Sequence, residues 1–357
     1  MDGYNKPISI YKLWFSIYIV ACHSCYMIQD HSKAAFRGGW ISVEFFFIIS
    51  GLLMVRTALK KDPRPERIGS DTFRFVTHKI GRLFPYYVFA YVVSFVYMHL
   101  FQAAHYTPGQ LLKEMAESIV PFFFLNLSGL DGYEVVGATW YISAMIIVLM
   151  VIYPLLLKNR NYFLWVFAPL AAVLGYGFIR QHDGAFLTTV WNGFYYAGIV
   201  RALAGMCLGA CVYLAAERLA AKAAPSGAVR WLLTALEVGI LVFASTRMYG
   251  DVGMDLAIFL IIAFALLTTI SFSGFTYTHR LFSKLNIKYI EQFSIALYLS
   301  HGRVAGMLGR LYGASADYQQ MLPIYFTVCF LTALADVLVV NCALKLYHRW
   351  RDARAIG

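Results

Sequence analysis

Residues 139–157 read TWYISAMIIVLMVIYPLLL, a run without a single charged side chain. About 20 apolar residues are enough for a helix to cross the hydrocarbon layer of a bilayer. Similar runs recur along the chain, and they are continuous, unlike the alternating ten-residue segments of a membrane β-barrel. Because lipid offers the backbone no hydrogen-bond partners, these runs predict an all-α membrane protein.

The composition of the whole chain also favours a membrane as its solvent. Of its 357 residues, 60% are hydrophobic and 14% are charged, which is too little polar surface for a water-soluble globule. The net charge of +11 comes from short basic clusters between the apolar runs, a pattern of membrane topology and not of a nucleic-acid surface. The first run contains Lys12 and no small-residue cleavage site, so we expect a retained helix and not a signal peptide.

We predict ten transmembrane helices in one domain, 1–357, without a fused soluble domain. The expected spans are about 8–28, 39–58, 80–101, 139–157, 162–179, 195–215, 231–248, 254–273, 288–309 and 321–345. About 19 Lys and Arg residues then lie on the side of both termini and about 5 on the other, which predicts cytoplasmic N- and C-termini. The one long connection, 102–138, would lie outside, and its amphipathic segment 111–127 is expected at the outer interface, above a cavity.

The six cysteines all lie in apolar runs, and no ectodomain needs a disulfide framework. Cys22 and Cys25 flank His23, but two thiols and one imidazole lack the fourth ligand of a closed metal site. We therefore predict buried thiols and no metal cofactor.

Ionisable side chains inside a bilayer are costly, so those within the expected spans are candidates for function. At 1.5 Å per residue, His23 and Glu44 each lie roughly 8 Å from the outer ends of their spans. Arg201, Ser143 and His301 lie roughly 6 to 12 Å from the outer ends of theirs. Satisfied core residues scattered at random would not favour one layer, so this layer predicts an active site in the outer third of the membrane.

A second group of charges lies toward the cytoplasm. Lys12 precedes His23 by eleven positions, and eleven helical steps return to nearly the same face, roughly 16 Å apart. Lys79 and Arg82 lie where the third span leaves the cytoplasm. The tendency of Lys and Arg to lie on the cytoplasmic side explains most of these charges. It does not explain why Lys12 and His23 lie on the same face of the first span. Together they predict a cationic mouth suited to phosphates, with an imidazole deeper on the same face.

Six motifs follow one another along the chain in a recognisable order. They are Lys12 through His23, GGWISVEFFFIISGLLM (38–54), KIGRLFP (79–85), TWYISA (139–144), RALAGMCLG (201–209) and FSIALYLSH (293–301). In this order and placement the sequence resembles the acyltransferase 3 family of bacterial membrane proteins, from the first expected span to the ninth.

The resemblance implies an O-acetyltransferase of the bacterial inner (plasma) membrane, which moves acetyl from acetyl-CoA to sugar hydroxyls of envelope polysaccharides. The family's essential first-span histidine corresponds to His23. The family commonly has Arg at the position of Lys12 and Asp at the position of Glu44; the charge survives, but Lys cannot make Arg's bidentate phosphate contact. The family's other functional positions correspond to Lys79, Arg82, Arg201 and His301.

These observations define the expected roles. We expect His23 to be the general base or an acyl-accepting nucleophile, with Glu44 orienting its ring. Arg201 would stabilise the oxyanion or bind the acceptor. The residues expected to bind acyl-CoA are Lys12, Lys79 and Arg82, and the acceptor-side candidates are Trp40, Trp140, Tyr141, Ser143 and His301.

Several alternatives stay open at this point. A flippase for a glycan or lipid-linked intermediate would also need intramembrane charges, but no thioester donor. A binding or sensory module would tolerate replacement of His23 and Glu44. The sequence leaves open whether the acyl group is acetyl, succinyl or another short chain, and which polysaccharide accepts it. The partners expected are acyl-CoA, a carbohydrate and the bilayer, with a homo-oligomer or a separate extracytoplasmic protein as further possibilities, and no nucleic acid.

Overall fold

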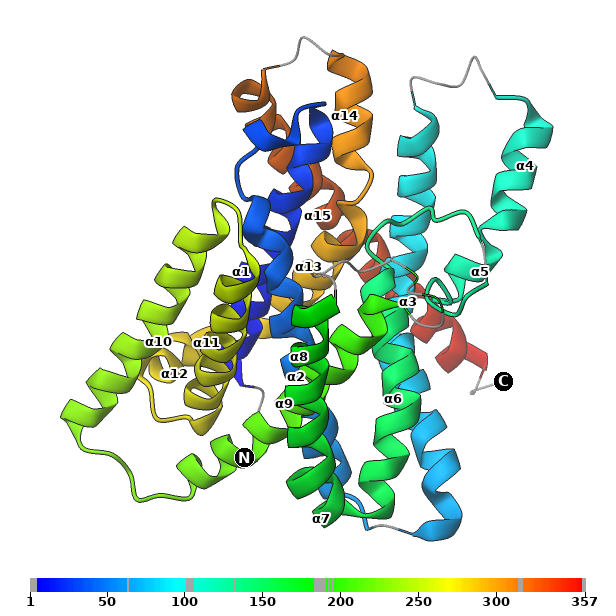
Figure 1. Cartoon of the computed structure of the whole chain (residues 1–357). Helices are drawn as coiled ribbons and strands as arrows, with labels where there is room; N and C mark the ends of the chain where they lie inside the picture. Colours follow the sequence, from blue (N-terminus) through cyan, green and yellow to red (C-terminus); the bar gives the residue numbers. More distant parts are fainter. Residues whose placement is uncertain are drawn as a thin grey trace.

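A computed structural model describes residues 5–62, 64–100, 106–130, 132–182, 191, 193, 196–313 and 317–354. These residues form a bundle of helices and contain no β-strand (Figure 1). Within them, nine helical stretches are long and apolar enough to cross a membrane. The prediction of an all-α membrane protein is confirmed, while the count of ten spans and the side on which the termini lie stay predictions.

The helices have the following bounds. They are α1 (Lys6–His23), α2 (Ser42–Leu59), α3 (Ile68–His99), α4 (Pro108–Glu117), α5 (Ile119–Phe122), α6 (Trp140–Lys158), α7 (Arg160–Tyr162), α8 (Ala168–His182), α9 (Ala197–Ala220), α10 (Gly227–Met248), α11 (Met254–Ser273), α12 (Tyr277–Leu281), α13 (Ile287–Ser300), α14 (Val304–Tyr312) and α15 (Tyr318–Arg354). A π-helical turn, Phe163–Phe167, joins α7 to α8 in one continuous stretch.

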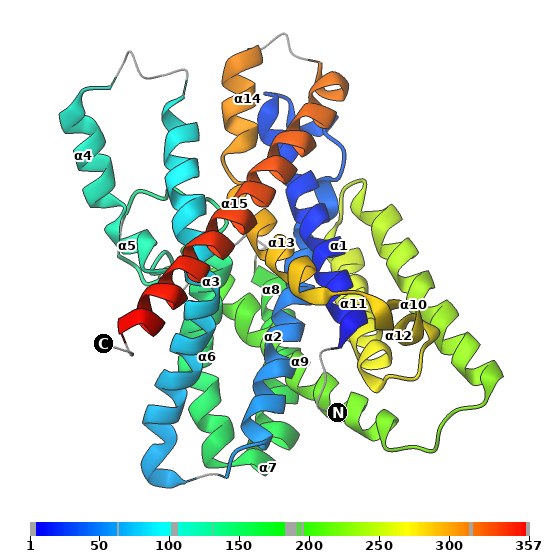
Figure 2. The same cartoon turned by 180° about the vertical axis from the view of Figure 1, so that it is seen from behind.

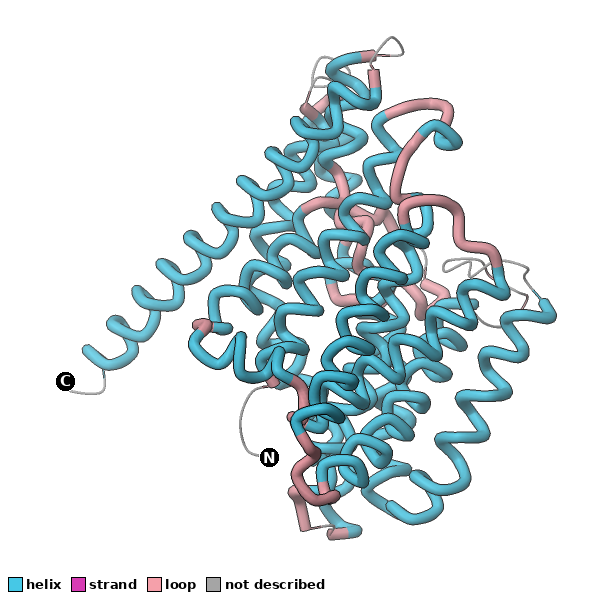
Figure 3. The backbone as a smooth tube through the Cα atoms, turned by 90° about the vertical axis from the view of Figure 1, so that its left-hand side faces the viewer, coloured by secondary structure: helices cyan, strands magenta, loops and turns pink. Residues whose placement is uncertain are grey.

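Helix α2 is the central element of the bundle, and α1, α6, α9 and α11 all pack against it. Most of its side chains are buried, including Phe45, Phe47 and Ile48. Helix α15 runs obliquely across the back of the molecule (Figure 2), where it contacts α13 and α3. Seen from the side, its C-terminal end extends away from the other helices (Figure 3). The start of α1 and the end of α15 both lie in the half of the bundle that contains α7 (Figure 1).

The span expected over 288–309 is two helices and not one. Helix α13 ends at Ser300, and α14 begins at Val304. Between them the Arg303 side chain donates from Nε to the carbonyl of Val135 at 2.6 Å and from a terminal nitrogen to the carbonyl of Glu134. These bonds hold the break against the 132–139 segment, a contact between distant parts of the chain that hydrophobic run length does not reveal.

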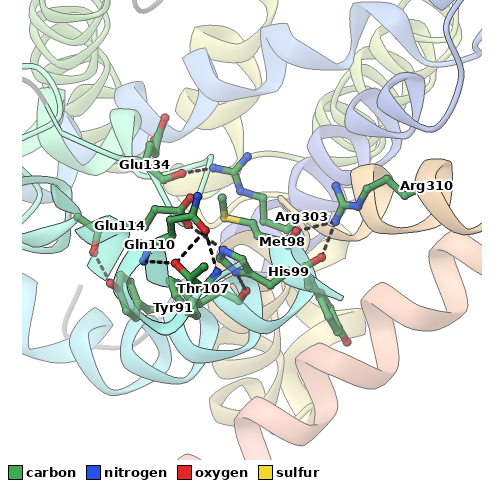
Figure 4. Close-up of polar contacts among 12 residues, drawn as sticks. Tyr91, Met98, His99, Thr107, Gln110, Glu114, Glu134, Arg303 and Arg310 are labelled. Carbon is green, nitrogen blue, oxygen red and sulfur yellow. Dashed lines mark hydrogen bonds and ion pairs between the residues drawn. The ribbon is translucent and has the colours of Figure 1, made fainter. Parts of the chain in front are cut away.

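The outer connection expected over 102–138 contains two short helices, α4 and α5, with residues 102–105 and 131 lying outside the described part. Helix α4 starts with a capping box, in which Thr107 and Gln110 each satisfy the other's backbone N–H. His99 at the end of α3 pairs with Glu114 of α4, with 2.8 Å between Nε2 and Oε2 (Figure 4). The connection is thereby tied to the top of α3.

Candidate active site

Two cavities lined by described residues lie toward opposite ends of the bundle, and we name them inner and outer after the predicted orientation of the chain. The inner cavity, of about 440 Å³, is lined by α1, α2, α3, α6 and α13 and includes Lys12, Lys79 and Tyr141. The outer cavity, of about 490 Å³, lies beneath the α13–α14 break and includes His23 and His301. The predicted cationic and imidazole groups therefore line separate spaces at opposite ends of α1.

The inner cavity carries a concentrated positive charge. Lys12 on α1 and both Lys79 and Arg82 on α3 line it, as the sequence predicts, and Arg56 on α2 joins them. The only carboxylate in its lining, among the described residues, is Glu291 on α13. Four cations against one anion make this cavity suited to a polyanionic group such as a phosphate.

Glu291 lies between two of these cations. Its Oε1 lies 3.9 Å from Lys12 Nζ, and its Oε2 lies 4.0 Å from Arg82 Nη2. Ser9 Oγ donates to the same carboxylate at 2.8 Å. The sequence shows Glu291 as an intramembrane charge, but its place between Lys12 and Arg82 depends on how α1, α3 and α13 pack.

The outer cavity contains a pair of histidines. His23 is the last residue of α1, and His301 follows the last residue of α13. His301 Nε2 lies 3.3 Å from His23 Nδ1, and the ring centroids are 4.9 Å apart. His301 is fully buried, whereas His23 is part-buried and borders the cavity.

The neighbouring carbonyls indicate which nitrogens of the pair carry protons. His23 Nδ1 lies 2.8 Å from the carbonyl of Ile19, and His301 Nδ1 lies 3.2 Å from that of Leu297. A carbonyl only accepts, so we assign a proton to each Nδ1. His23 Nε2 then carries a lone pair and has no hydrogen-bond partner among the described residues. A neutral imidazole presented in this way is a general base.

The expected pairing of Glu44 with His23 is wrong. Glu44 is fully buried and accepts from Arg201 Nε at 2.8 Å and from the Tyr176 hydroxyl at 2.7 Å. The depth of a residue along its span gives its height in the membrane but not the direction in which it points around the helix. His301, and not Glu44, is the partner of the His23 ring.

Glycines explain why Glu44 faces Arg201. A Cβ on Gly209 of α9 would lie 2.1 Å from the Ile48 carbonyl oxygen, and one on Gly51 of α2 would lie 1.9 Å from the Met206 carbonyl oxygen. Only glycine permits this backbone approach between α2 and α9. About two turns nearer the start of each helix, Arg201 on α9 is thereby brought directly against the Glu44 carboxylate on α2.

Arg201, Trp40 and Trp140 form one cluster inside the bundle, and their roles toward an acceptor stay predictions. The Arg201 guanidinium lies 5.6 Å from the Trp40 ring centroid and 5.2 Å from that of Trp140. Arg201 is 1% exposed and lines neither cavity. The indole rings contact the Arg201 guanidinium, and the cluster of Glu44, Arg201 and the two indoles packs inside the bundle.

Two further acceptor-side candidates lie elsewhere. Tyr141 lines the inner cavity, where its hydroxyl lies 3.1 Å from Ser50 Oγ. Ser143 is buried, and its hydroxyl accepts from the Leu127 backbone N–H at 3.1 Å. Ser143 thus anchors the outer connection, and of the predicted acceptor-side residues only His301 borders the outer cavity.

Tyr298, which the sequence analysis does not single out, lies between the two cavities. Its ring lines the inner cavity, and its hydroxyl donates at 2.8 Å to the carbonyl of Ala138, which lines the outer one. The Tyr298 and His301 ring centroids are 6.0 Å apart. The spacing of three residues on α13 could have signalled that both face the same way.

The apolar helices, the cationic cavity and the part-buried imidazole that borders the outer cavity define a multi-pass membrane protein with the geometry of an enzyme site. The family model described as an acyltransferase domain, Acyl_transf_3, matches residues 8–340. The chain therefore belongs to the acyltransferase 3 family and is a membrane acyltransferase. Comparisons with curated proteins and with solved structures gave no match.

Proposed function

We propose that this protein moves an acyl group, specifically acetyl, from acyl-CoA in the inner cavity to a sugar hydroxyl in the outer cavity. The observation that carries this proposal is that a cationic cavity and a histidine pair lie on opposite sides of Tyr298. The donor and the acceptor can thus approach one reaction centre from opposite faces of the membrane. The acceptor would belong to a polysaccharide of the bacterial envelope.

The donor fits the inner cavity by charge and by polarity. The phosphates of coenzyme A would lie among Lys12, Lys79 and Arg82. The walls beyond them are largely apolar, including Ile49, Leu53, Leu83 and Ile295, and they suit the neutral, flexible arm that carries the thioester. The thioester would then reach the region of Tyr298.

The transfer itself uses the lone pair of His23. His23 Nε2 takes the proton of the acceptor hydroxyl while the hydroxyl oxygen forms a bond to the thioester carbonyl carbon. The carbon–sulfur bond then breaks, and the coenzyme A thiolate takes the proton back from the imidazolium. His301 Nε2 and the Ile19 carbonyl lie 3.3 Å and 2.8 Å from His23 Nδ1, where they orient the ring and stabilise its charged form.

The test compares two histidine variants in purified protein reconstituted into lipid nanodiscs. His23→Ala is expected to lower transfer of labelled acetyl from acetyl-CoA to envelope glycan by about 10²- to 10⁴-fold, while acetyl-CoA binding persists. His182→Ala is the matched control, because His182 is an exposed histidine at the end of α8 and lines neither cavity. Normal transfer by His23→Ala would refute the mechanism.

Binding of the donor separates this function from that of a flippase. A flippase needs no thioester, so wild-type protein that shows no saturable binding of acetyl-CoA would contradict the proposal. Competition of acetyl-CoA with succinyl-CoA in the same assay identifies the acyl group that is preferred.

A further inference from the structure

The outer cavity has a charge of its own, apart from its two histidines. Arg303 and Arg310 line it, and no acidic side chain is found in that lining among the described residues. Arg303 immediately precedes α14 and Arg310 lies in its last turn, and both residues line the same cavity. The cavity into which His23 projects is therefore cationic.

Arg303 is held firmly and still has donors to spare. Its Nε donates to the Val135 carbonyl at 2.6 Å, and Nη2 donates to the Glu134 carbonyl. Nη1 has no hydrogen-bond partner in the described part of the chain. Two backbone carbonyls already fix the plane of the guanidinium. A ligand that accepts from its remaining N–H groups would therefore bind without a further loss of Arg303 side-chain entropy.

Arg310 closes the other side of the cavity. Its Nη2 donates to the carbonyls of Tyr97 and Met98, at 2.5 Å and 3.2 Å, near the end of α3 (Figure 4). A Cβ built on Gly306 would lie 3.7 Å from Arg310 Nη1, so the Arg310 guanidinium lies over Gly306. The absence of a side chain at Gly306, which also lines the cavity, leaves room beside that nitrogen.

The Glu134 carboxylate, close in sequence to the Val135 carbonyl that Arg303 bonds, is hydrogen-bonded elsewhere. Glu134 Oε1 accepts from Asn126 Nδ2 and from Thr139 Oγ1, each at 3.1 Å, and Glu134 is not part of the cavity lining. Burial of the Glu134 carboxyl raises its pKa above the usual glutamate value, while the Thr139 hydrogen bond and the Arg303 charge oppose that shift. Because Asn126 and Thr139 hold Oε1 of this carboxyl, and Arg303 bonds only backbone carbonyls through Nε and Nη2, Arg303 Nη1 stays available for a ligand.

We propose that the acceptor is an anionic glycan, whose carboxylate or phosphate is bound by Arg303 and Arg310 while one of its hydroxyls reaches His23. The proposal rests on the proposed function, because it takes the outer cavity as the acceptor site. Tyr26, Tyr106 and Tyr133 supply rings in the same lining, against which a sugar can pack. Guanidinium groups match the two oxygens of a carboxylate or phosphate with paired N–H donors.

Direct binding to the full-length protein in nanodiscs tests this inference without relying on catalysis. The probes are an oligomer of glucuronic acid and its carboxyl-reduced counterpart, and a phosphorylated oligosaccharide and its dephosphorylated counterpart. We expect at least one charged probe to bind about 10- to 100-fold more tightly than its neutral partner. The carboxylate and phosphate arms show which anion is recognised.

Three variants assign the preference to the arginines. Arg303→Gln and Arg310→Gln should each lower it about tenfold or more, whereas Arg303→Lys should keep part of it. Arg247→Gln is the control, because Arg247 is exposed at the same end of the bundle and lines neither cavity. Acetyl-CoA binding reports folding, and Arg310→Gln decides the matter if Arg303→Gln does not fold.

Equal binding of charged and neutral probes, binding of neither charged probe, or an unchanged preference in both glutamine variants would overturn the inference. Each of these outcomes leaves the proposed function standing wherever acetyl-CoA still binds and acetyl transfer still requires His23. Loss of transfer and of donor binding in the wild-type protein would instead count against the proposed function.

Discussion

The replacement Glu44→Gln distinguishes a structural role of this carboxylate from a catalytic one. The Glu44 and Arg201 side chains are 0% and 1% exposed, and 2.8 Å separates Oε1 from Nε. Removing one partner of a buried ion pair leaves an uncompensated charge and costs about 3–5 kcal/mol. We therefore expect a large loss of stability, with acyl transfer falling only in proportion to the folded fraction.

The assay is reversible unfolding in mixed micelles, combined with the rate of acyl transfer normalised to folded protein. The double variant Glu44→Gln/Arg201→Met removes the charge that the single variant leaves behind, so it should recover part of the lost free energy of unfolding. The structural assignment would be refuted by a Glu44→Gln variant of normal stability in which transfer is abolished. That outcome would return Glu44 to the role of catalytic partner of His23.

Three shorter predictions concern the donor site, the helix packing and the outer loops. Lys79→Gln should raise the KM for acetyl-CoA about tenfold with kcat nearly unchanged, as steady-state kinetics would show. Gly209→Ala should lower the thermal midpoint, because its Cβ would lie 2.1 Å from the Ile48 carbonyl oxygen; an unchanged midpoint would contradict the close packing of α2 and α9. Hydrogen bonding to Arg37 lowers the pKa of Asp251. The pair therefore stabilises the fold at pH values above the usual aspartate pKa, and this contribution is lost as the pH falls through the lowered pKa. In Asp251→Asn, the free energy of unfolding should depend less on pH in that acidic range.

The membrane fold and the family follow from local properties of the chain. Long apolar runs such as 139–157 require helices in a bilayer whatever their neighbours are, and nine helices long and apolar enough to cross a membrane occur in the part that the structure describes. The break after α13 does not follow, because it depends on hydrogen bonds from Arg303 to residues 134 and 135. Run length carries no information on such contacts.

Some residues of the candidate site could likewise be predicted from the sequence, and others could not. Lys12, Lys79 and Arg82 could be grouped in advance because charges near one membrane face share a height. The structure places all three in one cavity, where Glu291 lies between Lys12 and Arg82. His23 could be singled out because an imidazole inside a span needs a reason to be there. Its partner could not, since Glu44 and His301 are both plausible at the level of height alone.

The sequence by itself determined that this chain is a helical membrane protein of the acyltransferase 3 family with a charged interior. Hydrophobicity and motif order are properties of the linear sequence, so they can be recognised without knowing how the helices pack. Only the tertiary structure decided that His301 contacts His23, that Arg201 belongs to Glu44, and that two arginines share the outer cavity. Each of these depends on the rotation of one helix about its axis relative to another, which close contacts such as those of Gly51 and Gly209 fix in space.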